Sequence, residues 1–558
     1  MSLASDEWEL TAAQPREWGL ALPLWPTAWA AILVAALWLR LGAIDAVPLA
    51  PDEAARALEA RDIWRGTAGP YSAAPLLPNL LAIWFALFSA ADGPARVPSA
   101  LAGWALCLTP LLFRARLGTG AALASTALLA FSPLGLLAAR SAHPAALALL
   151  AGALAAGAVL KGFERGDGRW LIASGVAVAA GLGATPLFVS QVVAVIVAWS
   201  LYPPLAERHR LDLRRWAPRA IIAGLVAALL LDTLLLTRPS GLQAGLIDPF
   251  TGWLSAIRLS AATFLSGALL GIHEVLLLAL ALFGLPVTLR ETLGRFLAAW
   301  ALAGVTLALL SSPPDLAALA APTVPLALLG GLGVVRLAGL RPRWRPAVWL
   351  TSLALLVPPA FLALAIGSSV NRGAPMGAGA FAIAAGGLVA IVLLAGSWLE
   401  LADVRAALLG AACVALMALS LTFLTRLNYA GYERGEPALL GQSSRPTLRQ
   451  VEQRAYDWWR QDPTAPIRVE ASLRPLLAWA LRDGPPVEWI STAPPTADRA
   501  ILGAETSASR PAAGWVRLVV ADRYAAPTEP ISPQALWRWL VLRQSLVRPE
   551  PYAILTTL

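Results

Sequence analysis

The chain has 558 residues, of which 58% are hydrophobic and only 14% are charged, and its mean hydropathy is +0.65. These values exclude an ordinary soluble domain, and repeated apolar runs of spanning length predict a polytopic membrane protein. The formal net charge of +9 does not indicate a nucleic-acid partner, because the basic residues lie in short loops between apolar runs, where topology signals are found.

The N-terminus lacks the pattern of a cleavable signal peptide. We expect residues 1–23 to be a cytoplasmic leader and the first apolar run to be a membrane anchor. The two cysteines, Cys107 and Cys413, each lie inside an apolar run, so neither a disulfide framework nor a cysteine metal site is indicated. Richness in Ala, Leu, Gly, Pro and Arg is typical of a GC-rich bacterial genome.

Thirteen apolar stretches of about 17–24 residues are long enough to span a bilayer. They lie near residues 24–44, 97–113, 119–138, 143–160, 170–185, 186–202, 219–236, 265–288, 295–311, 316–336, 346–367, 377–397 and 404–424. We expect residues 24–425 to form one α-helical transmembrane domain of about 13 helices.

One further apolar stretch, Leu76 to Ala90, is ambiguous, and loop charge decides it. If this stretch does not cross, nearly all arginine-rich loops fall on one side, which the positive-inside rule makes cytoplasmic. These loops hold Arg114 and Arg116, Lys161–Arg169, Glu207–Arg219, Arg290–Arg295, Arg336–Arg345 and Glu400–Arg405. Leu76–Ala90 is therefore predicted to be a juxtamembrane helix within a first outward loop, residues 45–96.

With this topology, the loop 237–264 and everything after Arg426 face outward. The loop contains Gly, Pro and Trp253, which suggest an ordered cap over the membrane surface. Residues 426–558 gain charge and lose long apolar runs, and strands alternate with helices there, so we expect a small extracytoplasmic α/β domain. Helices are predicted at 446–460, 475–482 and 533–544, and strands at 467–471, 487–490, 500–502 and 515–521.

The first outward loop carries two adjacent acids, Asp52 and Glu53, directly after the first apolar segment. Carboxylates held at a membrane surface are costly unless they face a polar cavity, so they are candidate functional groups. An equally weighted alternative is that they cap the helix that follows, because acids suit a helix N-terminus.

Several motifs in this layout are similar to those of one family. The first outward loop runs from Asp52-Glu53 to Trp64-Arg65-Gly66, and Ala95-Arg96-Val97-Pro98-Ser99-Ala100-Leu101 follows a segment rich in Pro and Leu. Further matching segments are Phe131-Ser132-Pro133-Leu134, Ala139-Arg140-Ser141, Pro239-Ser240-Gly241-Leu242, Pro313-Pro314-Asp315 and Leu477-Ala478-Trp479-Ala480-Leu481-Arg482-Asp483. Over most of its length the chain resembles the GT-C superfamily of polyprenyl-phosphate-dependent glycosyltransferases. The dolichyl-phosphate-mannose-protein mannosyltransferase-like branch, in particular the flippase activity-associated proteins, is the most similar.

The resemblance implies that the acid of the first outward loop, Asp52, is the catalytic carboxylate. It also implies a second acid after the Ser-Arg of the next outward loop. Here that loop reads Ala139-Arg140-Ser141-Ala142-His143-Pro144 and holds no acid. His143 could substitute in binding or proton transfer, although a lone His at a helix start is more often a cap or solvated.

A polyprenyl-phosphate donor, an unidentified acceptor and membrane lipids are the implied partners. On this interpretation Asp52 accepts the proton of the acceptor hydroxyl. Glu53 orients Asp52 or binds a divalent metal ion, Mg²⁺ or Mn²⁺. Arg140 contacts the donor phosphate, with Arg258 and Arg238 as alternatives.

Each of these assignments has a structural alternative. Arg238 and Arg258 could equally be interfacial anchors near lipid headgroups. His273 and Glu274 lie within an apolar span, so Glu274 is expected to line the substrate cavity or, equally, to form an interhelical hydrogen bond.

The principal hypothesis is an inverting glycosyltransferase of the cell membrane that moves a sugar to an extracytoplasmic acceptor. The missing second acid favours an alternative, a degenerate relative that binds lipid-linked sugars or assists their flipping or assembly. A transporter would need matching halves with broken helices, and no convincing repeat is present. An accessory subunit of a membrane complex is the remaining alternative.

Overall fold

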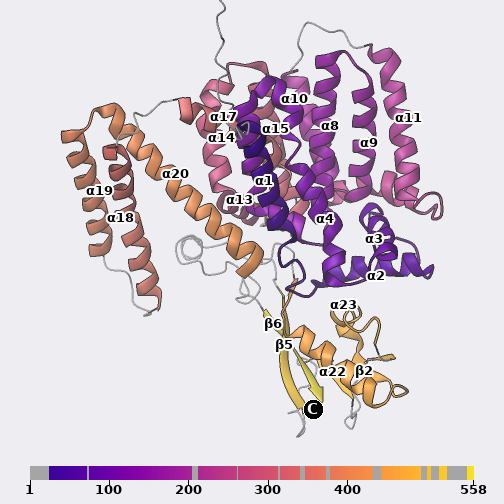
Figure 1. The fold of residues 1–558 in the computed structure, drawn as a ribbon. Coiled ribbons are helices and arrows are strands. Elements are labelled where there is room, and N and C mark those ends of the chain that lie inside the picture. The colour runs from indigo at the N-terminus through magenta and orange to yellow at the C-terminus, as the bar shows by residue number, and fades with distance from the viewer. Residues whose placement is uncertain are drawn as a thin grey trace, which may run out of the picture.

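The computed structural model describes residues 24–71, 74–203, 212–259, 262–311, 315–339, 346–371, 378–430, 442–484, 486–491, 499–503, 515–523 and 550–557. Within these ranges a helical bundle is followed by a small unit that contains a β-sheet (Figure 1). The fold class predicted from the sequence, a polytopic helical protein with a C-terminal α/β unit, is confirmed.

The helices of the bundle follow the apolar runs of the sequence. They are α1 (Leu24–Leu41), α2 (Pro51–Arg65), α3 (Leu76–Leu87), α4 (Asp92–Leu106), α5 (Pro110–Leu117), α6 (Thr119–Ala130), α7 (Pro133–Arg140), α8 (Ala145–Arg165), α9 (Arg169–Ala184), α10 (Phe188–Leu201), α11 (Leu213–Asp232), η1 (Gln243–Ile247), α12 (Asp248–Ala256), α13 (Ala262–His273), α14 (Val275–Thr288), α15 (Thr292–Leu310), α16 (Leu316–Ala320), α17 (Thr323–Gly339), α18 (Pro346–Asn371), α19 (Ala378–Trp398), α20 (Leu401–Thr425) and η2 (Arg426–Ala430).

Each predicted span coincides with one helix or with two consecutive helices. The break between α6 and α7 bends that pair by 57° and falls at Pro133, which has no N–H to donate to the preceding turn. In the described part of the chain, six helices are long and apolar enough to cross a membrane, or seven if the bent pair is one span. Several other apolar helices are shorter, so the number of 13 crossings stays a prediction.

The stretch whose crossing was ambiguous forms α3, a helix of 12 residues. At 1.5 Å per residue it is about 18 Å long, which is short of the roughly 30 Å hydrocarbon core. Its buried residues Leu77, Leu81 and Phe85 form one core cluster with Ala54 and Ala57 of α2. Both helices lie at the end of the bundle that faces the sheet domain (Figure 1).

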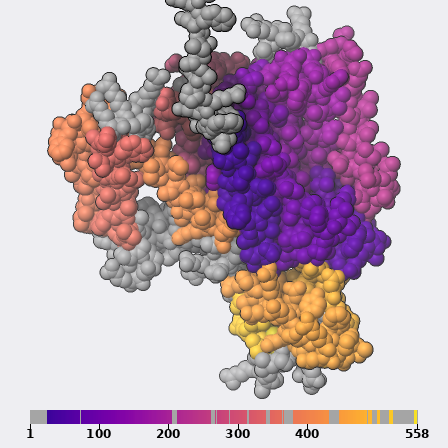
Figure 2. Space-filling view, in the orientation of Figure 1, coloured from indigo at the N-terminus to yellow at the C-terminus, as the bar shows by residue number. Residues whose placement is uncertain are grey.

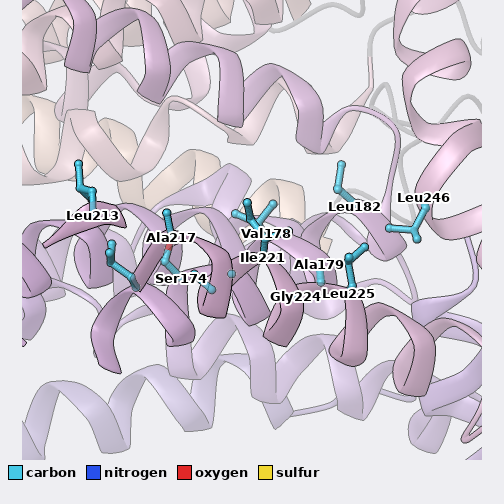
Figure 3. A pocket seen from close by; sticks show the side chains of 13 residues that line it. Ser174, Val178, Ala179, Leu182, Leu213, Ala217, Ile221, Gly224, Leu225 and Leu246 are labelled. Atoms are coloured by element: carbon cyan, nitrogen blue, oxygen red, sulfur yellow. The ribbon is translucent and has the colours of Figure 1, made fainter. Parts of the chain in front are cut away.

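Small residues bring the membrane helices close together. A Cβ placed on Gly175 of α9 would lie 2.2 Å from the Ala220 carbonyl oxygen of α11, so only glycine allows this approach. Beside this contact, α9 and α11 border an apolar groove of about 380 Å³, lined by residues such as Val178, Ile221 and Leu225 (Figure 3). A wall of this composition suits contact with lipid chains.

The C-terminal unit contains one six-stranded mixed sheet with the strand order β1-β5-β6-β4-β2-β3. Its elements are β1 (Gln442–Ser444), α22 (Leu448–Gln461), β2 (Ile467–Glu470), η3 (Ala471–Leu473), α23 (Arg474–Leu477), β3 (Val487–Ile490), β4 (Ala500–Gly503), β5 (Trp515–Arg523) and β6 (Glu550–Thr557). β2 pairs in parallel with β3 and β4, whereas the other pairs are antiparallel. The four predicted strands coincide with β2 to β5, and β1 and β6 were missed. The helix predicted at 533–544 lies outside the described residues.

Trp479 anchors the sheet domain to the first outward loop. Its indole is 3% exposed, stacks on Phe85 of α3 with the ring centroids 6.0 Å apart, and donates from Nε1 to Asp92 Oδ1 at 2.7 Å. The guanidinium of Arg482 covers the ring at 3.9 Å, and Arg61 of α2 pairs with Asp483. The domain therefore sits directly on α2 and α3 (Figure 2), while α18 and α19 project to the side of the bundle (Figure 1).

We expect Trp479→Ala to destabilise the protein strongly, because truncating a buried aromatic side chain costs about 3–5 kcal/mol. Thermal unfolding of the protein purified in detergent measures this loss. Trp459→Ala is the matched control, since that indole is 36% exposed. Equal shifts of the melting temperature in both variants would contradict the anchoring role.

Candidate active site

The end of the bundle that faces the sheet domain brings together polar residues from three separate segments. They are the start of α2, the connection between α7 and α8, and the residue that precedes α16. Both acids of the first outward loop lie on the first turn of α2, which begins with Pro51. Proline suits this position because its missing N–H would have no intrahelical acceptor there.

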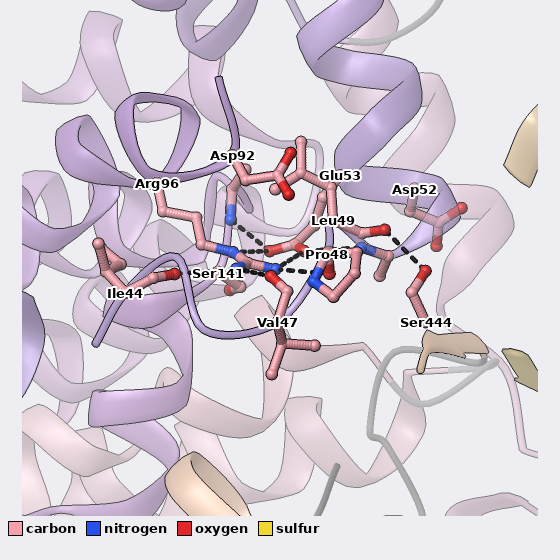
Figure 4. A network of polar contacts seen from close by, with 12 residues as sticks. Ile44, Val47, Pro48, Leu49, Asp52, Glu53, Asp92, Arg96, Ser141 and Ser444 are labelled. Atoms are coloured by element: carbon pink, nitrogen blue, oxygen red, sulfur yellow. Dashed lines mark hydrogen bonds and ion pairs between the residues drawn. The ribbon is translucent and has the colours of Figure 1, made fainter. Parts of the chain in front are cut away.

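Glu53 is buried and forms an ion pair with Arg96 of α4. The shortest contact joins Arg96 Nη2 to Glu53 Oε2 at 2.6 Å, and Nε donates to Oε1 at 3.3 Å (Figure 4). Glu53 also accepts from the N–H groups of Ala50, at 2.9 Å, and Ala142, at 2.6 Å. The other hydrogen bonds of Arg96 go to the carbonyls of the 44–48 segment.

This network keeps Glu53 ionised. Burial alone would raise the pKa of the carboxyl, but the charge of Arg96 and the hydrogen bonds from Arg96, Ala50 and Ala142 outweigh it and hold the pKa below its usual value. Both carboxylate oxygens are engaged inside the protein. The geometry therefore favours a structural role for Glu53, fixing the start of α2 against α4 and the loop before α8.

The residues in place do not fit the divalent metal ion that was considered at Glu53. Its oxygens already accept from three partners, and in the described part of the chain no group of three or more His, Cys, Asp or Glu side chains could hold a metal. A metal requirement stays a prediction.

Asp52 behaves differently from its neighbour. It is exposed, and Figure 4 shows its carboxylate pointing away from the Glu53–Arg96 network. Arg56 lies one helical turn further along the same face of α2 and donates to the Asp52 carbonyl at 3.4 Å. Asp52 is thus the acid of the pair that is free to meet a substrate.

His143 is buried in the connection between α7 and α8. Its Nδ1 accepts from the Ala145 N–H at 3.2 Å, and its Nε2 lies 3.9 Å from Asp315 Oδ2. Burial, together with the charge of Arg56, lowers the pKa of His143 to about 3, and the opposing charge of Glu53 is the smaller influence. The imidazole is therefore neutral at physiological pH, with its proton on Nε2.

Asp315 was not among the residues predicted for the site. It caps α16, because its Oδ1 accepts from the N–H groups of Ala317 at 2.6 Å and Ala318 at 3.4 Å. Burial raises the pKa of its carboxyl, although the cap and the charge of Arg56 oppose that shift. The side chain is 32% exposed, so it can be reached from outside. Arg56 was missed too, and its position one turn after Asp52 was the available signal.

Arg140 is the last residue of α7, and its guanidinium reaches the C-terminal end of α1. Its guanidinium donates to the carbonyls of Leu39 at 2.8 Å, Gly42 at 2.7 Å and Ala43 at 3.1 Å, and it covers the ring of Tyr429 at 4.3 Å. A cation suits the unpaired carbonyls of a helix end. These contacts favour a structural role, and the predicted contact with a donor phosphate stays a prediction.

The two alternative arginines lie at opposite ends of the 237–259 segment. Arg238 donates to the Gly69 carbonyl and covers the ring of Tyr71 at 4.3 Å, so it contacts the chain between α2 and α3. Arg258 is exposed, and its N–H donates to the Leu310 carbonyl at 2.9 Å, next to the bridge between Ile257 and Ser311. Arg258 therefore adjoins the C-terminal end of α15.

Glu274 connects α13 to α14, and its carboxylate reaches the break between α6 and α7. Its Oε1 accepts from Ser132 Oγ at 2.6 Å and from the Leu134 N–H at 3.0 Å. Ser132 in turn caps α7 by accepting from the Gly135 N–H at 3.0 Å. The structure thus realises the interhelical hydrogen bond that was the alternative to a substrate contact.

Comparisons with known proteins agree with this architecture. Residues 72–232 match a family model described as dolichyl-phosphate-mannose-protein mannosyltransferase. The crystal structure of ArnT from Cupriavidus metallidurans bound to undecaprenyl phosphate is similar, with a TM-score of 0.52 and 18% identity over 85% of this chain and 87% of that chain. The crystal structure of ArnT in the apo state has the same TM-score, 0.52, and the same identity, 18%, over 84% of this chain and 86% of that chain. The archaeal oligosaccharyltransferase AglB from Archaeoglobus fulgidus has a TM-score of 0.47 and 12% identity, over 83% of this chain and 64% of that chain. No curated protein sequence matches.

The chain therefore has the fold of the GT-C superfamily of membrane glycosyltransferases. Residues 72–232 are in addition similar to the mannosyltransferase family model. The resemblance inferred from the sequence motifs is confirmed at this level, and so is the expectation of a membrane protein.

The two adjacent acids should respond differently to removal of their charge. We expect Glu53→Gln to lower the free energy of unfolding by about 3–5 kcal/mol, because it leaves the Arg96 charge buried without its partner. Asp52→Asn should change stability by no more than about 0.5 kcal/mol, as for most surface substitutions. Thermal unfolding in detergent compares them, and equal stabilities would rule out the structural role of Glu53.

His143 should make the protein less stable in mild acid. Its pKa of about 3 in the folded state is below the value near 6.5 in the unfolded chain, so its stabilising contribution is present above pH 6.5 and lost as the pH falls toward 3. We expect a loss of up to about 1.4 kcal/mol per pH unit in that window. In His143→Asn, unfolding measured from pH 7 to pH 5 should depend less steeply on pH, and an unchanged slope would contradict the buried neutral imidazole.

Proposed function

We propose that the protein is a glycosyltransferase that moves a sugar from a polyprenyl-phosphate donor to an acceptor on the outward side of the membrane. The observation that carries this proposal is the exposed carboxylate of Asp52, which lies one helical turn from Arg56 on α2. The charge of Arg56 in turn acts on both His143 and Asp315. The GT-C fold supports it, and so does the lipid phosphate bound to ArnT, a protein of similar fold.

The reaction is a single displacement with inversion at the anomeric carbon. The acceptor hydroxyl transfers its proton to the Asp52 carboxylate while its oxygen forms a bond to the anomeric carbon. The bond from that carbon to the phosphate oxygen breaks, and polyprenyl phosphate leaves with the electron pair. Arg56 is suited to stabilise the developing negative charge. Arg258 is the second candidate, because its N–H bonds to the Leu310 carbonyl at the end of α15.

The transferred group is a hexose or a pentose, and the acceptor is a protein, a lipid or a glycan. We place the enzyme in the plasma or inner membrane of a bacterium. The N-terminus and the arginine-rich loops lie in the cytoplasm, and the C-terminal domain lies outside. This orientation puts α2, α3 and the sheet domain on the side where lipid-linked sugars are used.

A second candidate function is a non-catalytic relative that binds lipid-linked sugars or assists their flipping or assembly. The sequence Ser141-Ala142-His143, which lacks the acid expected there, favours it. Such a protein would bind a polyprenyl-phosphate sugar without ever releasing polyprenyl phosphate.

Asp52→Asn is the decisive variant. We expect transfer to fall by about 10²–10⁴-fold, because the acceptor proton loses its base. The assay follows release of polyprenyl phosphate from a panel of polyprenyl-phosphate hexoses and pentoses, with bacterial membranes as the acceptor source. Asp45→Asn, another exposed acid of the same outward loop, is the control and should remain active. Full activity of Asp52→Asn would refute the assignment, and binding without turnover in the wild type would favour the second candidate.

A further inference from the structure

His143 and Asp315 face each other across a gap of a particular size. The two residues come from different segments, and 3.9 Å separates His143 Nε2 from Asp315 Oδ2. A direct hydrogen bond between nitrogen and oxygen spans about 2.7–3.2 Å, so the two atoms do not bond directly. On one side of the gap the Asp315 side chain is 32% exposed, whereas the His143 side chain is 8% exposed.

The polarity of each side of the gap is fixed by its other contacts. Nδ1 of His143 accepts from the Ala145 N–H, so the neutral ring carries its proton on Nε2 and presents a donor. Asp315 Oδ1 is held by the N–H groups at the start of α16, which leaves Oδ2 as an acceptor facing the ring. A donor and an acceptor therefore stand opposite each other, held in place by backbone contacts.

One hydroxyl group satisfies both sides at once, because a hydroxyl donates one hydrogen bond and accepts another. An oxygen about 2.8 Å from each of two atoms that lie 3.9 Å apart sees them at an angle of about 90°, not far from the tetrahedral angle of a hydroxyl. A phosphate oxygen could only accept from the ring, and an ammonium group could only donate to Asp315. The gap thus selects a hydroxyl over either charged group.

We propose that His143 and Asp315 form a subsite that binds one hydroxyl of a sugar. This inference rests on the proposed function and adds a specificity-determining pair to it. Arg56, whose charge acts on both residues, connects the subsite to the face of α2 that carries Asp52. The sugar that supplies the hydroxyl belongs to the lipid donor or to a glycan acceptor.

Two substitutions remove one side of the gap each and keep the local fold. In His143→Asn the side-chain oxygen can still accept from the Ala145 N–H, as Asn does in Asx-turns, but the donor is lost. In Asp315→Asn the amide oxygen can still cap α16, while its NH₂ group replaces the acceptor. Asp248→Asn, at an exposed acid of α12, is the matched control, and melting temperatures verify folding.

The test measures binding to the full-length protein in lipid nanodiscs. The probes are polyprenyl phosphate and its mannose, glucose and arabinose conjugates. For the best-bound conjugate, the series of monodeoxy analogues is added. We expect each substitution to weaken the best-bound conjugate about tenfold, which corresponds to about 1.4 kcal/mol, and to leave bare polyprenyl phosphate unchanged. One monodeoxy analogue should bind wild type and variants equally weakly.

The remaining outcomes separate the sources of the hydroxyl. If donor binding is unchanged while the KM for a glycan acceptor rises in both variants, the hydroxyl belongs to the acceptor and the proposal holds. If neither donor binding nor the acceptor KM changes in the variants, a water molecule fills the gap and the proposal is wrong. The proposal is equally wrong if no conjugate binds more tightly than bare polyprenyl phosphate and no acceptor KM changes. Asp52→Asn should keep donor binding while losing transfer, so failure of the subsite and failure of the proposed function remain distinguishable.

Discussion

The buried ion pair between Glu53 and Arg96 is the constraint on which the end of the bundle next to the sheet domain depends. Taking two charges out of water is expensive, and the cost is met only because hydrogen bonds satisfy both partners. Those hydrogen bonds reach the 44–50 segment, α2, α4 and the residue before His143. One interaction therefore fixes the relative positions of three connections that the membrane helices alone would leave independent.

The same constraint separates the roles of two neighbouring acids. Successive residues on a helix point about 100° apart, and while Glu53 turns into the protein, Asp52 lies on the exposed side of α2. The anchoring of Trp479 on Phe85 and Asp92 holds the sheet domain against this end of the bundle. Asp52 thus lies at the end of the helical bundle that faces the sheet domain, with its carboxylate exposed.

Local patterns in the sequence predicted what depends on local chemistry. Apolar runs predicted the helices of the bundle, and the alternation of short strands with helices after Arg426 predicted β2 to β5. Two adjacent acids after the first apolar run marked the start of α2. The roles of polar residues were harder to predict, because they depend on partners far away in the chain. Arg140 has the charge expected for a phosphate contact, yet it meets the carbonyls at the end of α1. Glu274 suggested a cavity, yet it bonds to Ser132 at a helix break.

The absence of an acid after Arg140 is where this contrast matters most. Judged from that loop alone, the site has lost one of its two carboxylates. In the folded chain, Asp315 approaches the same loop from the start of α16, and the neutral ring of His143 faces it at 3.9 Å. A site is defined by the distances between its groups and not by their order in the chain, so Asp315 places a carboxylate beside the loop that lacks one. The missing acid is consequently a weaker argument for a degenerate protein than the sequence makes it.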